Sequence, residues 1–317
     1  AMPKKAQEER LEDMTPCIAC LQGCVANMYA GNPVCCLTNP FLGHEAEPLE
    51  KVEEPKKVMV IGGGVAGLSA AFIAKERGHE VTLYEAGDVL GGNMRLAAYP
   101  PGKGDITNMI RSYIHRCQKD GVKIVMNCEV TPELIKEEKP DSVIIATGSK
   151  TLILPIEGID NPAIIHGSDL LDGKRAAGKK VLVVGGGMVG CETAAFLGEQ
   201  EHDVTVIEFR DTVGADVIHE HRVYLMKDFE DYGIKEITGA KVCKFYEDGV
   251  EYETADGVRH ESRGYDSVIL SMGFRNYNPL EEKIKDLVPE THVIGDAIRA
   301  RRALDATKEA YEVASRI

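Results

Sequence analysis

The chain has 317 residues, of which 44% are hydrophobic and 28% are charged, so it is long enough for two packed domains and too apolar to be disordered. Its 51 acidic and 37 basic residues give a formal net charge of -14, which argues against nucleic acid or an anionic membrane as a partner because both need a positive surface. No apolar run is long enough to span a bilayer, and the charged N-terminus lacks the apolar stretch of a secretion signal, so we expect a cytoplasmic protein.

The N-terminal segment, residues 1–53, contains five of the nine cysteines in a region rich in loop-forming residues. Such clustering is more typical of metal ligation in a reducing compartment than of disulfide bonds. Four of these thiols have a three-plus-one spacing that can hold either tetrahedral zinc or a [4Fe–4S] cluster: Cys17, Cys20, Cys24 and Cys36. Cys35 competes for the fourth position. A redox dithiol at Cys17 and Cys20 is disfavoured because this pair precedes the first nucleotide-binding strand.

Two long segments of the chain repeat each other at an offset of 123 residues. The sequence KVMVIGGGVAG at 57–67 recurs as KVLVVGGGMVG at 180–190, and VTLYE at 81–85 recurs as VTVIE at 204–208. Each copy therefore has a β-branched strand, a glycine turn, an Ala-rich helix and a second strand that ends in Glu. Strands that alternate with helices in this way predict parallel βαβ units.

The repeat predicts an α/β fold with two doubly wound, Rossmann-like dinucleotide-binding domains that follow the cysteine-rich segment. A turn-rich connector separates the copies, and a last strand and helix after the second copy are expected to complete the first domain, so that the second domain is an insertion. The expected boundaries are 54–150 with 276–317 for the first domain and 151–275 for the second. The helices after the glycine turns are expected at 68–77 and 191–200.

Each copy carries a Gly-x-Gly-x-x-Gly motif between its strand and its helix, made by Gly62, Gly64 and Gly67 and by Gly185, Gly187 and Gly190. The first glycine permits a tight turn, the second lets a pyrophosphate approach the backbone, and the third lets helix and strand pack closely. Glu85 and Glu208 each follow the third glycine by 18 residues, where a carboxylate can accept hydrogen bonds from ribose hydroxyls. One such motif could simply make a turn, but the repeated context predicts two dinucleotide sites.

The two sites are expected to take different cofactors. FAD is the better occupant of the first site because Gly295 and Asp296 follow a late strand, where the carboxylate could bind the ribityl hydroxyls. Asp296 could instead be a simple helix cap. At the second site, Glu208 would repel the extra phosphate of NADPH and favours NADH, although Arg210 could offset that repulsion.

Several motifs together resemble the C-terminal half of the 2,4-dienoyl-CoA reductase and 2-enoate reductase family, relatives of old yellow enzyme and trimethylamine dehydrogenase. These motifs are Cys17-Ile-Ala-Cys-Leu-Gln-Gly-Cys24, Cys36-Leu-Thr-Asn-Pro40 with the following His44-Glu45, Leu90-Gly-Gly-Asn93, Ala98-Tyr-Pro-Pro-Gly102 and Ala303-Leu-Asp-Ala306. The likeness covers nearly the whole chain.

The resemblance implies site residues and a partner. It assigns the [4Fe–4S] cluster to Cys17, Cys20, Cys24 and Cys36, with Cys35 as a bystander. It assigns FAD to Gly62, Gly64, Gly67, Glu85, Gly92, Asn93, Gly148, Gly295 and Asp296, and the nicotinamide cofactor to Gly185, Gly187, Gly190, Glu208 and Arg210. The family also places an FMN-bearing TIM barrel before the cysteines, which we expect here in another segment or subunit, and the full enzyme is compatible with a homo-oligomer.

The resulting hypothesis is a flavin-dependent NAD(P)H oxidoreductase. In it, FAD takes hydride and the cluster relays electrons to the FMN domain for reduction of activated C=C bonds in enoates, enones or dienoyl-CoA thioesters. The sequence assigns no catalytic side chain. The alternative is a non-catalytic, ADP-binding structural module such as that of trimethylamine dehydrogenase.

Overall fold

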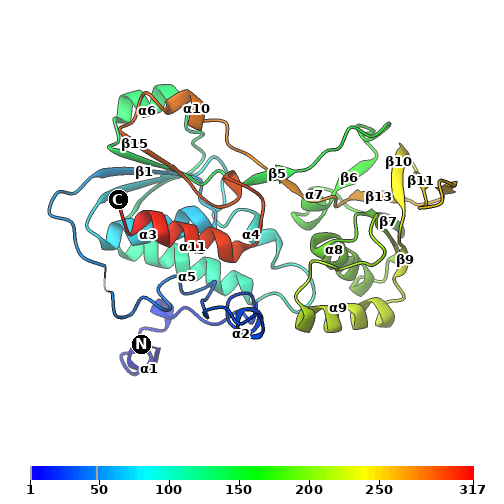
Figure 1. Cartoon of the computed structure of the whole chain (residues 1–317), viewed down its shortest axis with the longest axis horizontal. Coiled ribbons are helices and arrows are strands. Elements are labelled where there is room, and N and C mark those ends of the chain that lie inside the picture. The colour runs from blue at the N-terminus through cyan, green and yellow to red at the C-terminus, as the bar shows by residue number, and fades with distance from the viewer. Residues whose placement is uncertain (1, 48) are drawn as a thin grey trace. The chain divides into compact units, whose positions relative to one another are not determined.

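The computed structural model of the chain describes residues 2–47 and 49–317, so residues 1 and 48 of the predicted N-terminal segment lie outside the described part. The chain divides into two compact units (Figure 1). Unit 1 comprises Ala1–Ala98, Gly104–Lys150 and Arg275–Ile317, and unit 2 comprises Tyr99–Lys103 and Thr151–Phe274.

Unit 1 is built on a five-stranded parallel sheet in the order β15-β4-β1-β2-β3. Its strands are β1 (Lys57–Ile61), β2 (Glu80–Tyr84), β3 (Lys123–Val125), β4 (Ser142–Ile145) and β15 (Glu290–Val293). Val58 and Val60 point into one hydrophobic core, whereas Met59 and Ile61 point into a second core on the opposite face. A strand buried on both faces has apolar residues at successive positions, which explains why β1 is a continuous apolar run.

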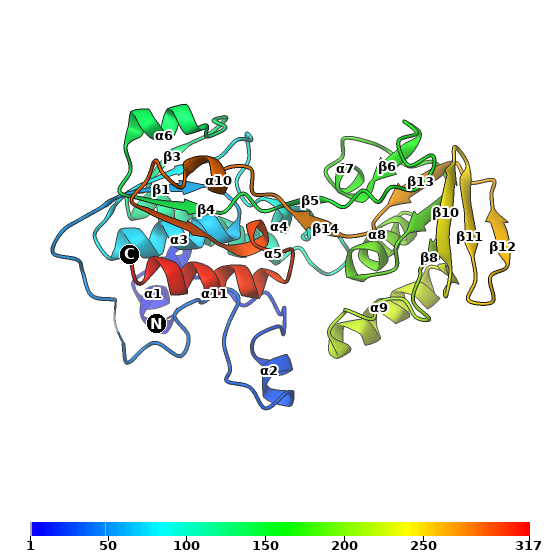
Figure 2. The same ribbon diagram turned by 45° about the horizontal axis from the view of Figure 1, so that its top comes forward.

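Helices cover both faces of this sheet, as Figures 1 and 2 show. On one face lie α3 (Val65–Glu76), α5 (Ile106–Lys119) and α11 (Ala303–Ala314), and on the other lie α6 (Pro132–Glu138) and α10 (Glu281–Ile284). Residues Val65 to Ala74 of α3 are all buried, because this helix contacts the sheet, α5 and α11. Small residues let all three neighbours approach it, which accounts for its Ala-rich sequence.

The N-terminal segment packs on unit 1 through a few apolar side chains. It contains α1 (Met2–Gln7), a 3-10 helix η1 (Leu11–Asp13) and α2 (Val25–Tyr29). Ile18 and Leu37 are buried in the same core as α3, and the Tyr113 hydroxyl on α5 donates to the Leu37 carbonyl at 3.0 Å. The ring of Phe41 packs edge-on against Tyr311 of α11, 5.6 Å away between ring centroids. This segment is therefore part of the fold of unit 1.

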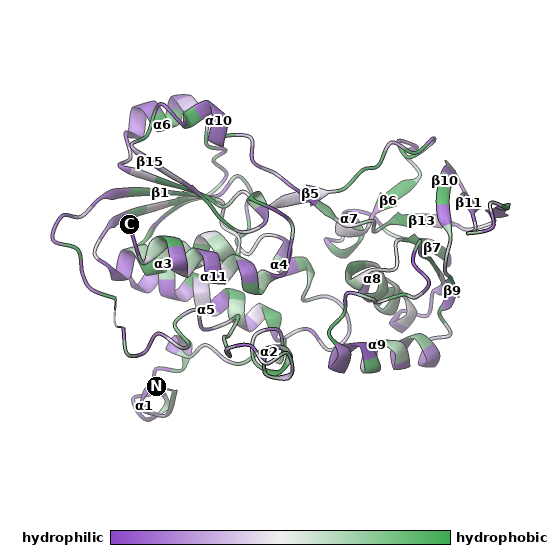
Figure 3. Ribbon diagram, in the orientation of Figure 1, coloured by the Kyte–Doolittle hydropathy of each residue, from purple (hydrophilic) through white to green (hydrophobic). Residues whose placement is uncertain are grey.

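Unit 2 repeats the architecture with a five-stranded parallel sheet in the order β6-β13-β7-β8-β9. Its strands are β6 (Ile164–His166), β7 (Lys180–Val184), β8 (Asp203–Ile207), β9 (Lys235–Ile237) and β13 (Ser267–Leu270), and its helices are α7 (Gly167–Leu171), α8 (Met188–Glu199) and α9 (His219–Asp231). Val181 and Val183 pack into the core with α8 and α9. In Figure 3, β7 and β13 are mainly hydrophobic while α9 is mixed in colour, as expected for buried strands and a surface helix.

The second face of the unit 2 sheet is covered by an antiparallel sheet that the sequence analysis did not predict. It consists of β10 (Lys241–Tyr246), β11 (Gly249–Glu253) and β12 (Arg259–Ser262). Phe245 and Val250 from this sheet share a core with Leu182 and Val184 of β7. Antiparallel strands thus bury the face that α6 and α10 bury in unit 1.

The α/β class with parallel, Rossmann-like sheets is confirmed. The helices after the glycine turns begin at Val65 and Met188, three residues before the predicted starts, because the third glycine of each motif lies inside the helix. The strands β5 (Ser149–Thr151) and β14 (Phe274–Asn276) pair with each other in a two-stranded sheet. Among the described residues, no helix combines the length and apolarity needed to cross a bilayer.

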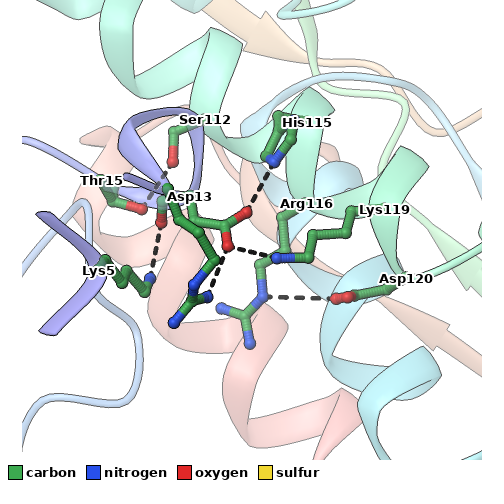
Figure 4. A pocket seen from close by; sticks show the side chains of 9 residues that line it. Lys5, Asp13, Thr15, Ser112, His115, Arg116, Lys119 and Asp120 are labelled. Atoms are coloured by element: carbon green, nitrogen blue, oxygen red, sulfur yellow. Dashed lines mark hydrogen bonds and ion pairs between the residues drawn. The ribbon is translucent and has the colours of Figure 1, made fainter. Parts of the chain in front are cut away.

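One charged cluster joins the N-terminal segment to α5 (Figure 4). The Asp13 carboxylate bonds His115 Nε2 at 2.9 Å, Arg10 at 2.7 Å and the Lys119 ammonium, and only 7% of its side chain is exposed. Hydrogen bonds from Lys119, His115 and Arg10 hold the pKa of Asp13 well below its usual range. This carboxylate is therefore the polar anchor of residues 10–15 on α5.

We expect Asp13→Asn to loosen this attachment, because a neutral amide no longer pairs with the two cations around it. Trypsin should then cleave after Arg10 several-fold faster at pH 7, as measured by mass spectrometry, while the neighbouring exposed Glu12→Gln variant should match the parent chain. The pKa of Asp13 is lowered in the folded chain. Its contribution to the stability of the folded chain is therefore present above about pH 4 and is lost only as the pH falls through the lowered pKa. Equal cleavage of all three proteins would contradict the anchoring role.

Candidate functional site

In unit 1, β1 turns into α3 through three glycines that have different roles. Gly62 has a φ of +111°, and a Cβ there would lie 2.3 Å from the Ala146 carbonyl oxygen. A Cβ on Gly67 would lie 1.9 Å from the carbonyl oxygen of Gly62. At Gly64, by contrast, an added Cβ would meet nothing within 4 Å. The fold requires the first and third glycines, whereas the second leaves open space in front of the helix N-terminus.

The turn from β7 into α8 in unit 2 has the same geometry with one difference. Gly185 has a φ of +104°, with a Cβ 2.5 Å from the Ser271 carbonyl oxygen, and a Cβ on Gly190 would lie 1.8 Å from the Gly185 carbonyl oxygen. A Cβ on Gly187, however, would lie 3.4 Å from Oδ2 of Asp216. The space in front of this helix therefore has a carboxylate beside it.

The two acidic residues at the ends of β2 and β8 are held in the same way. Glu85 accepts the N–H of Gly63 at 2.7 Å on one carboxylate oxygen and the N–H of Gly87 at 2.7 Å on the other. Glu208 likewise accepts the N–H of Gly186 at 2.6 Å and the N–H of Arg210 at 2.9 Å. A carboxylate has about four acceptor positions, so each side chain keeps capacity for ribose hydroxyls beside its glycine turn.

The loop after Glu85 runs beside the first glycine turn. The N–H of Gly91 donates to the Gly63 carbonyl at 2.8 Å, and Gly91 forms a parallel bridge with Gly64. Gly92 has a φ of +55°, and a Cβ there would lie 3.1 Å from the Gly64 Cα. Asn93 follows as the first residue of α4 (Asn93–Leu96). The predicted residues Gly92 and Asn93 thus lie at the predicted turn.

Asn93 and Asp296 are linked through a serine that the sequence analysis missed. The Asn93 amide nitrogen lies 3.3 Å from Oγ of Ser149, and that hydroxyl donates to Asp296 Oδ2 at 2.8 Å. Asp296 Oδ1 accepts the N–H of Arg301 at 3.0 Å. Ser149 directly follows the predicted Gly148, so its place beside a predicted site residue was the available signal. These contacts put three polar groups on one side of the unit 1 sheet's carboxyl edge.

Gly295 lies in the short 3-10 helix η2 (Gly295–Ala297) in a left-handed conformation, with a φ of +64°. A Cβ there would lie 3.1 Å from Cβ of Ala66 in α3, so this glycine lets the segment after β15 approach α3. Its N–H donates to Glu309 of α11 at 2.7 Å. Gly148 has a φ of +75° and accepts the N–H of Tyr277 at 2.9 Å.

Arg210 is exposed, three residues beyond the end of β8. Its backbone N–H binds Glu208, as described above, and its carbonyl accepts the N–H of Gly239 at 2.9 Å. The backbone is thereby fixed while the guanidinium faces solvent.

The five N-terminal cysteines are all reduced, and their surroundings differ. Cys17 and Cys24 are exposed, whereas Cys20, Cys35 and Cys36 are half-buried. Burial raises the pKa of Cys20, and the nearby thiols of Cys36, Cys24 and Cys17 raise it further. Cys35 is held elsewhere: its N–H donates to the Gly23 carbonyl at 2.9 Å, and its sulfur accepts from the Asn27 amide at 3.4 Å.

The thiols of Cys36, Cys24 and Cys17 thus all influence Cys20, but Cys17 and Cys36 also have contacts of their own, with the Ala19 N–H and the Thr38 hydroxyl at 3.3 Å each. Within residues 2–47 and 49–317, no three His, Cys, Asp or Glu side chains gather closely enough to hold a metal ion. The donor chemistry of the segment fits a thiolate-bound cluster. The loop geometry of the described residues does not assemble the ligand sphere.

A buried ion pair in unit 2 was also missed. Glu192 of α8 is only 8% exposed and pairs with the Lys103 ammonium. Burial raises the pKa of Glu192, and the charge of Lys103 opposes that rise. A Glu in an otherwise small and apolar helix sequence was the available signal. The pair fixes the short segment Tyr99–Lys103 within unit 2.

Comparison with known proteins identifies the family of the chain. A family described as pyridine nucleotide-disulphide oxidoreductase matches residues 56–294. A cinnamate reductase from Clostridium sporogenes is 33% identical across 100% of this chain and 48% of its own length. A metal reductase from Desulforamulus reducens is 32% identical across 99% of this chain and 52% of its own length.

The structure of a 2-naphthoyl-CoA reductase in complex with 2-naphthoyl-CoA superposes with a TM-score of 0.95 and 33% identity, over 100% of this chain and 48% of that one. The chain therefore spans about half the length of these relatives. The resemblance to the flavin half of the enoate reductase family is confirmed.

Two glycine substitutions should separate folding from nucleotide binding. Gly67→Ala inserts a Cβ against the Gly62 carbonyl and should destabilise the chain by about 1–3 kcal/mol, because helix and strand must separate. Gly64→Ala fills open space and should cost about 1 kcal/mol or less, yet it should lower FAD retention at least tenfold because the pyrophosphate loses its approach to the backbone. Thermal unfolding and flavin content measure the two effects. Full flavin retention by Gly64→Ala would contradict the assignment.

Proposed function

Because the chain belongs to the pyridine nucleotide-disulphide oxidoreductase family, whose members use FAD and NAD(P)H, we propose that unit 1 holds FAD and unit 2 receives the nicotinamide cofactor. Family membership makes the chain part of an NAD(P)H-dependent flavin oxidoreductase. The observation that carries the assignment is the repeated cradle: a glycine turn, a helix N-terminus and a strand-end carboxylate in each unit.

In unit 1, the chain's own residues would bind and orient FAD. The open space at Gly64 admits the pyrophosphate to the unpaired N–H groups that start α3. Glu85 accepts hydrogen bonds from the adenosine ribose. Asp296, oriented by Ser149 and by the Arg301 N–H, would accept hydrogen bonds from the ribityl hydroxyls. The neutral Asn93 amide lies in the same hydrogen-bonded chain and adds no negative charge beside the flavin.

In unit 2, Glu208 would accept from the ribose hydroxyls of the nicotinamide cofactor, which supports NADH as the preferred donor. A 2′-phosphate would stand against this carboxylate and would have only the exposed Arg210 guanidinium to pair with. FAD supplies hydride acceptance from the nicotinamide, and a [4Fe–4S] cluster supplies one-electron transfer. Cys17, Cys20, Cys24 and Cys36 would hold the cluster.

The electrons would pass to an FMN-bearing TIM-barrel domain or subunit, for reduction of activated C=C bonds in enoates, enones or dienoyl thioesters. Two facts support this destination. The chain spans about half the length of its relatives, and those relatives include reductases named for cinnamate and for 2-naphthoyl-CoA. A structural, ADP-binding module is the second candidate, and the visible spectrum of the purified chain separates the two, because only a flavin-bound chain has the absorbance bands of flavin in addition to those of a cluster.

The flavin-loaded chain should reduce an artificial dye with NADH faster than with NADPH, and it should not reduce an enoate by itself. Glu208→Gln removes the charge that opposes the 2′-phosphate, so it should narrow the preference for NADH by about tenfold. Steady-state dye reduction with each donor measures this. Absence of dye reduction with both donors would overturn the proposed function.

Alkylation should identify the cluster ligands. Burial raises the pKa of Cys117 and of Cys191 to about 12, so both are protonated and protected near pH 8, where iodoacetamide should react first with the exposed Cys17 and Cys24. If the chain is reconstituted anaerobically with iron and sulfide before alkylation, the four proposed ligands should be protected from iodoacetamide, whereas Cys35 should stay reactive. Mass spectrometry reads each site. Protection of Cys35 in place of Cys36 would contradict the ligand assignment.

A further inference from the structure

The loops that follow the two strand-end carboxylates are equivalent in sequence position and in docking. The offset of 123 residues places Gly91 on Gly214. The Gly91 N–H donates to the Gly63 carbonyl at 2.8 Å, and the Gly214 N–H donates to the Gly186 carbonyl at 2.7 Å. Both loops therefore attach, through the same hydrogen bond, to the residue that lies between the first and second glycines of their own motif. The residues two positions further on, Asn93 and Asp216, are structural counterparts.

These counterparts face different groups. Oδ1 of Asp216 accepts the N–H of Met188, the first residue of α8, at 2.8 Å. In unit 1, the Asn93 amide is directed to Ser149. A Cβ added to Gly64 would meet nothing within 4 Å. A Cβ added to Gly187 would lie 3.4 Å from one carboxylate oxygen of Asp216 and 3.6 Å from the other. One copy thus has a neutral side chain turned aside, and the other has a carboxylate at the helix N-terminus.

A carboxylate and a pyrophosphate need the same partners at this position. The first N–H groups of a helix have no acceptor within the helix, and the positive end of the helix dipole attracts either anion. Two anions cannot share the Met188 N–H, and their like charges repel at short range. A dinucleotide that enters the unit 2 cradle must therefore displace Asp216.

We propose that Asp216 is an internal competitor for the nicotinamide cofactor, which lowers the affinity of unit 2 for its pyrophosphate and hastens release. This rests on the proposed function, in which unit 2 receives NAD(P)H. Arg222 of α9 donates to the Val213 carbonyl at 3.1 Å and to the Thr212 hydroxyl at 2.9 Å, so the base of the loop is held to α9. Unit 1 has no such competitor at Asn93, which suits a flavin that stays bound while the nicotinamide exchanges.

The test is NADH binding to the full chain whose bound FAD has been reduced anaerobically beforehand, so that no hydride is transferred, measured by fluorescence titration for the parent, Asp216→Asn and Asp211→Asn. Asp216→Asn installs the side chain of the unit 1 counterpart and keeps an oxygen for the Met188 N–H. It should bind NADH about three- to tenfold more tightly. Asp211→Asn removes the same charge from an exposed residue of the same loop and should leave the Kd unchanged. The gain should shrink in about 1 M salt, because screening weakens the repulsion.

Each other outcome overturns the inference. Equal Kd values for the parent and Asp216→Asn would remove Asp216 as a competitor and leave the proposed function standing. Weaker binding by Asp216→Asn, with unchanged melting temperature and flavin content, would make Asp216 a residue that binds the cofactor. A gain of the same size in Asp211→Asn would reduce the effect to general charge. No NADH binding to any of the three proteins would remove the proposed function as well.

Discussion

The contact on which both units depend is the approach of the third glycine of each motif to the carbonyl of the first. A Cβ at Gly67 or Gly190 would lie within 2 Å of that oxygen, so only glycine lets the helix start directly on the end of its strand. This contact directs the helix N-terminus toward the carboxyl edge of the sheet. The acidic residue at the end of the neighbouring strand is then beside the same turn, where it can accept from a ribose.

The two copies of this cradle differ at one position to which we assign the difference in cofactor retention. The strand-end carboxylates and the loop hydrogen bonds are the same in both, whereas Asn93 is replaced by Asp216 in the second copy. A neutral amide favours long retention of a nucleotide, and a carboxylate at the helix start favours exchange. A duplicated cradle can in this way give one resident and one exchanging cofactor without a change of fold.

The features that were predicted from sequence are those with strong local signals. Sequence alone predicts the apolar runs of β1 and β7 and the glycine turns, because each of these features requires particular residue types at a fixed spacing. The helix starts were wrong by three residues, since a glycine inside a helix resembles a boundary in sequence. The antiparallel sheet, Ser149 and the Asp13 anchor depend on contacts between distant segments, which periodicity does not report. The spacing of the thiols identifies candidate ligands, but the positions of their sulfur atoms depend on a loop without periodic structure.

The central claim is that one chain holds two dinucleotides at once, in separate cradles. The most direct measurement is the stoichiometry of NADH binding to chain that is already saturated with FAD and anaerobically reduced, so that no hydride is transferred, with free flavin monitored in the same titration. The account predicts one FAD retained and one NADH bound per chain. Release of FAD as NADH binds, or NADH binding to the flavin-free chain alone, would contradict it.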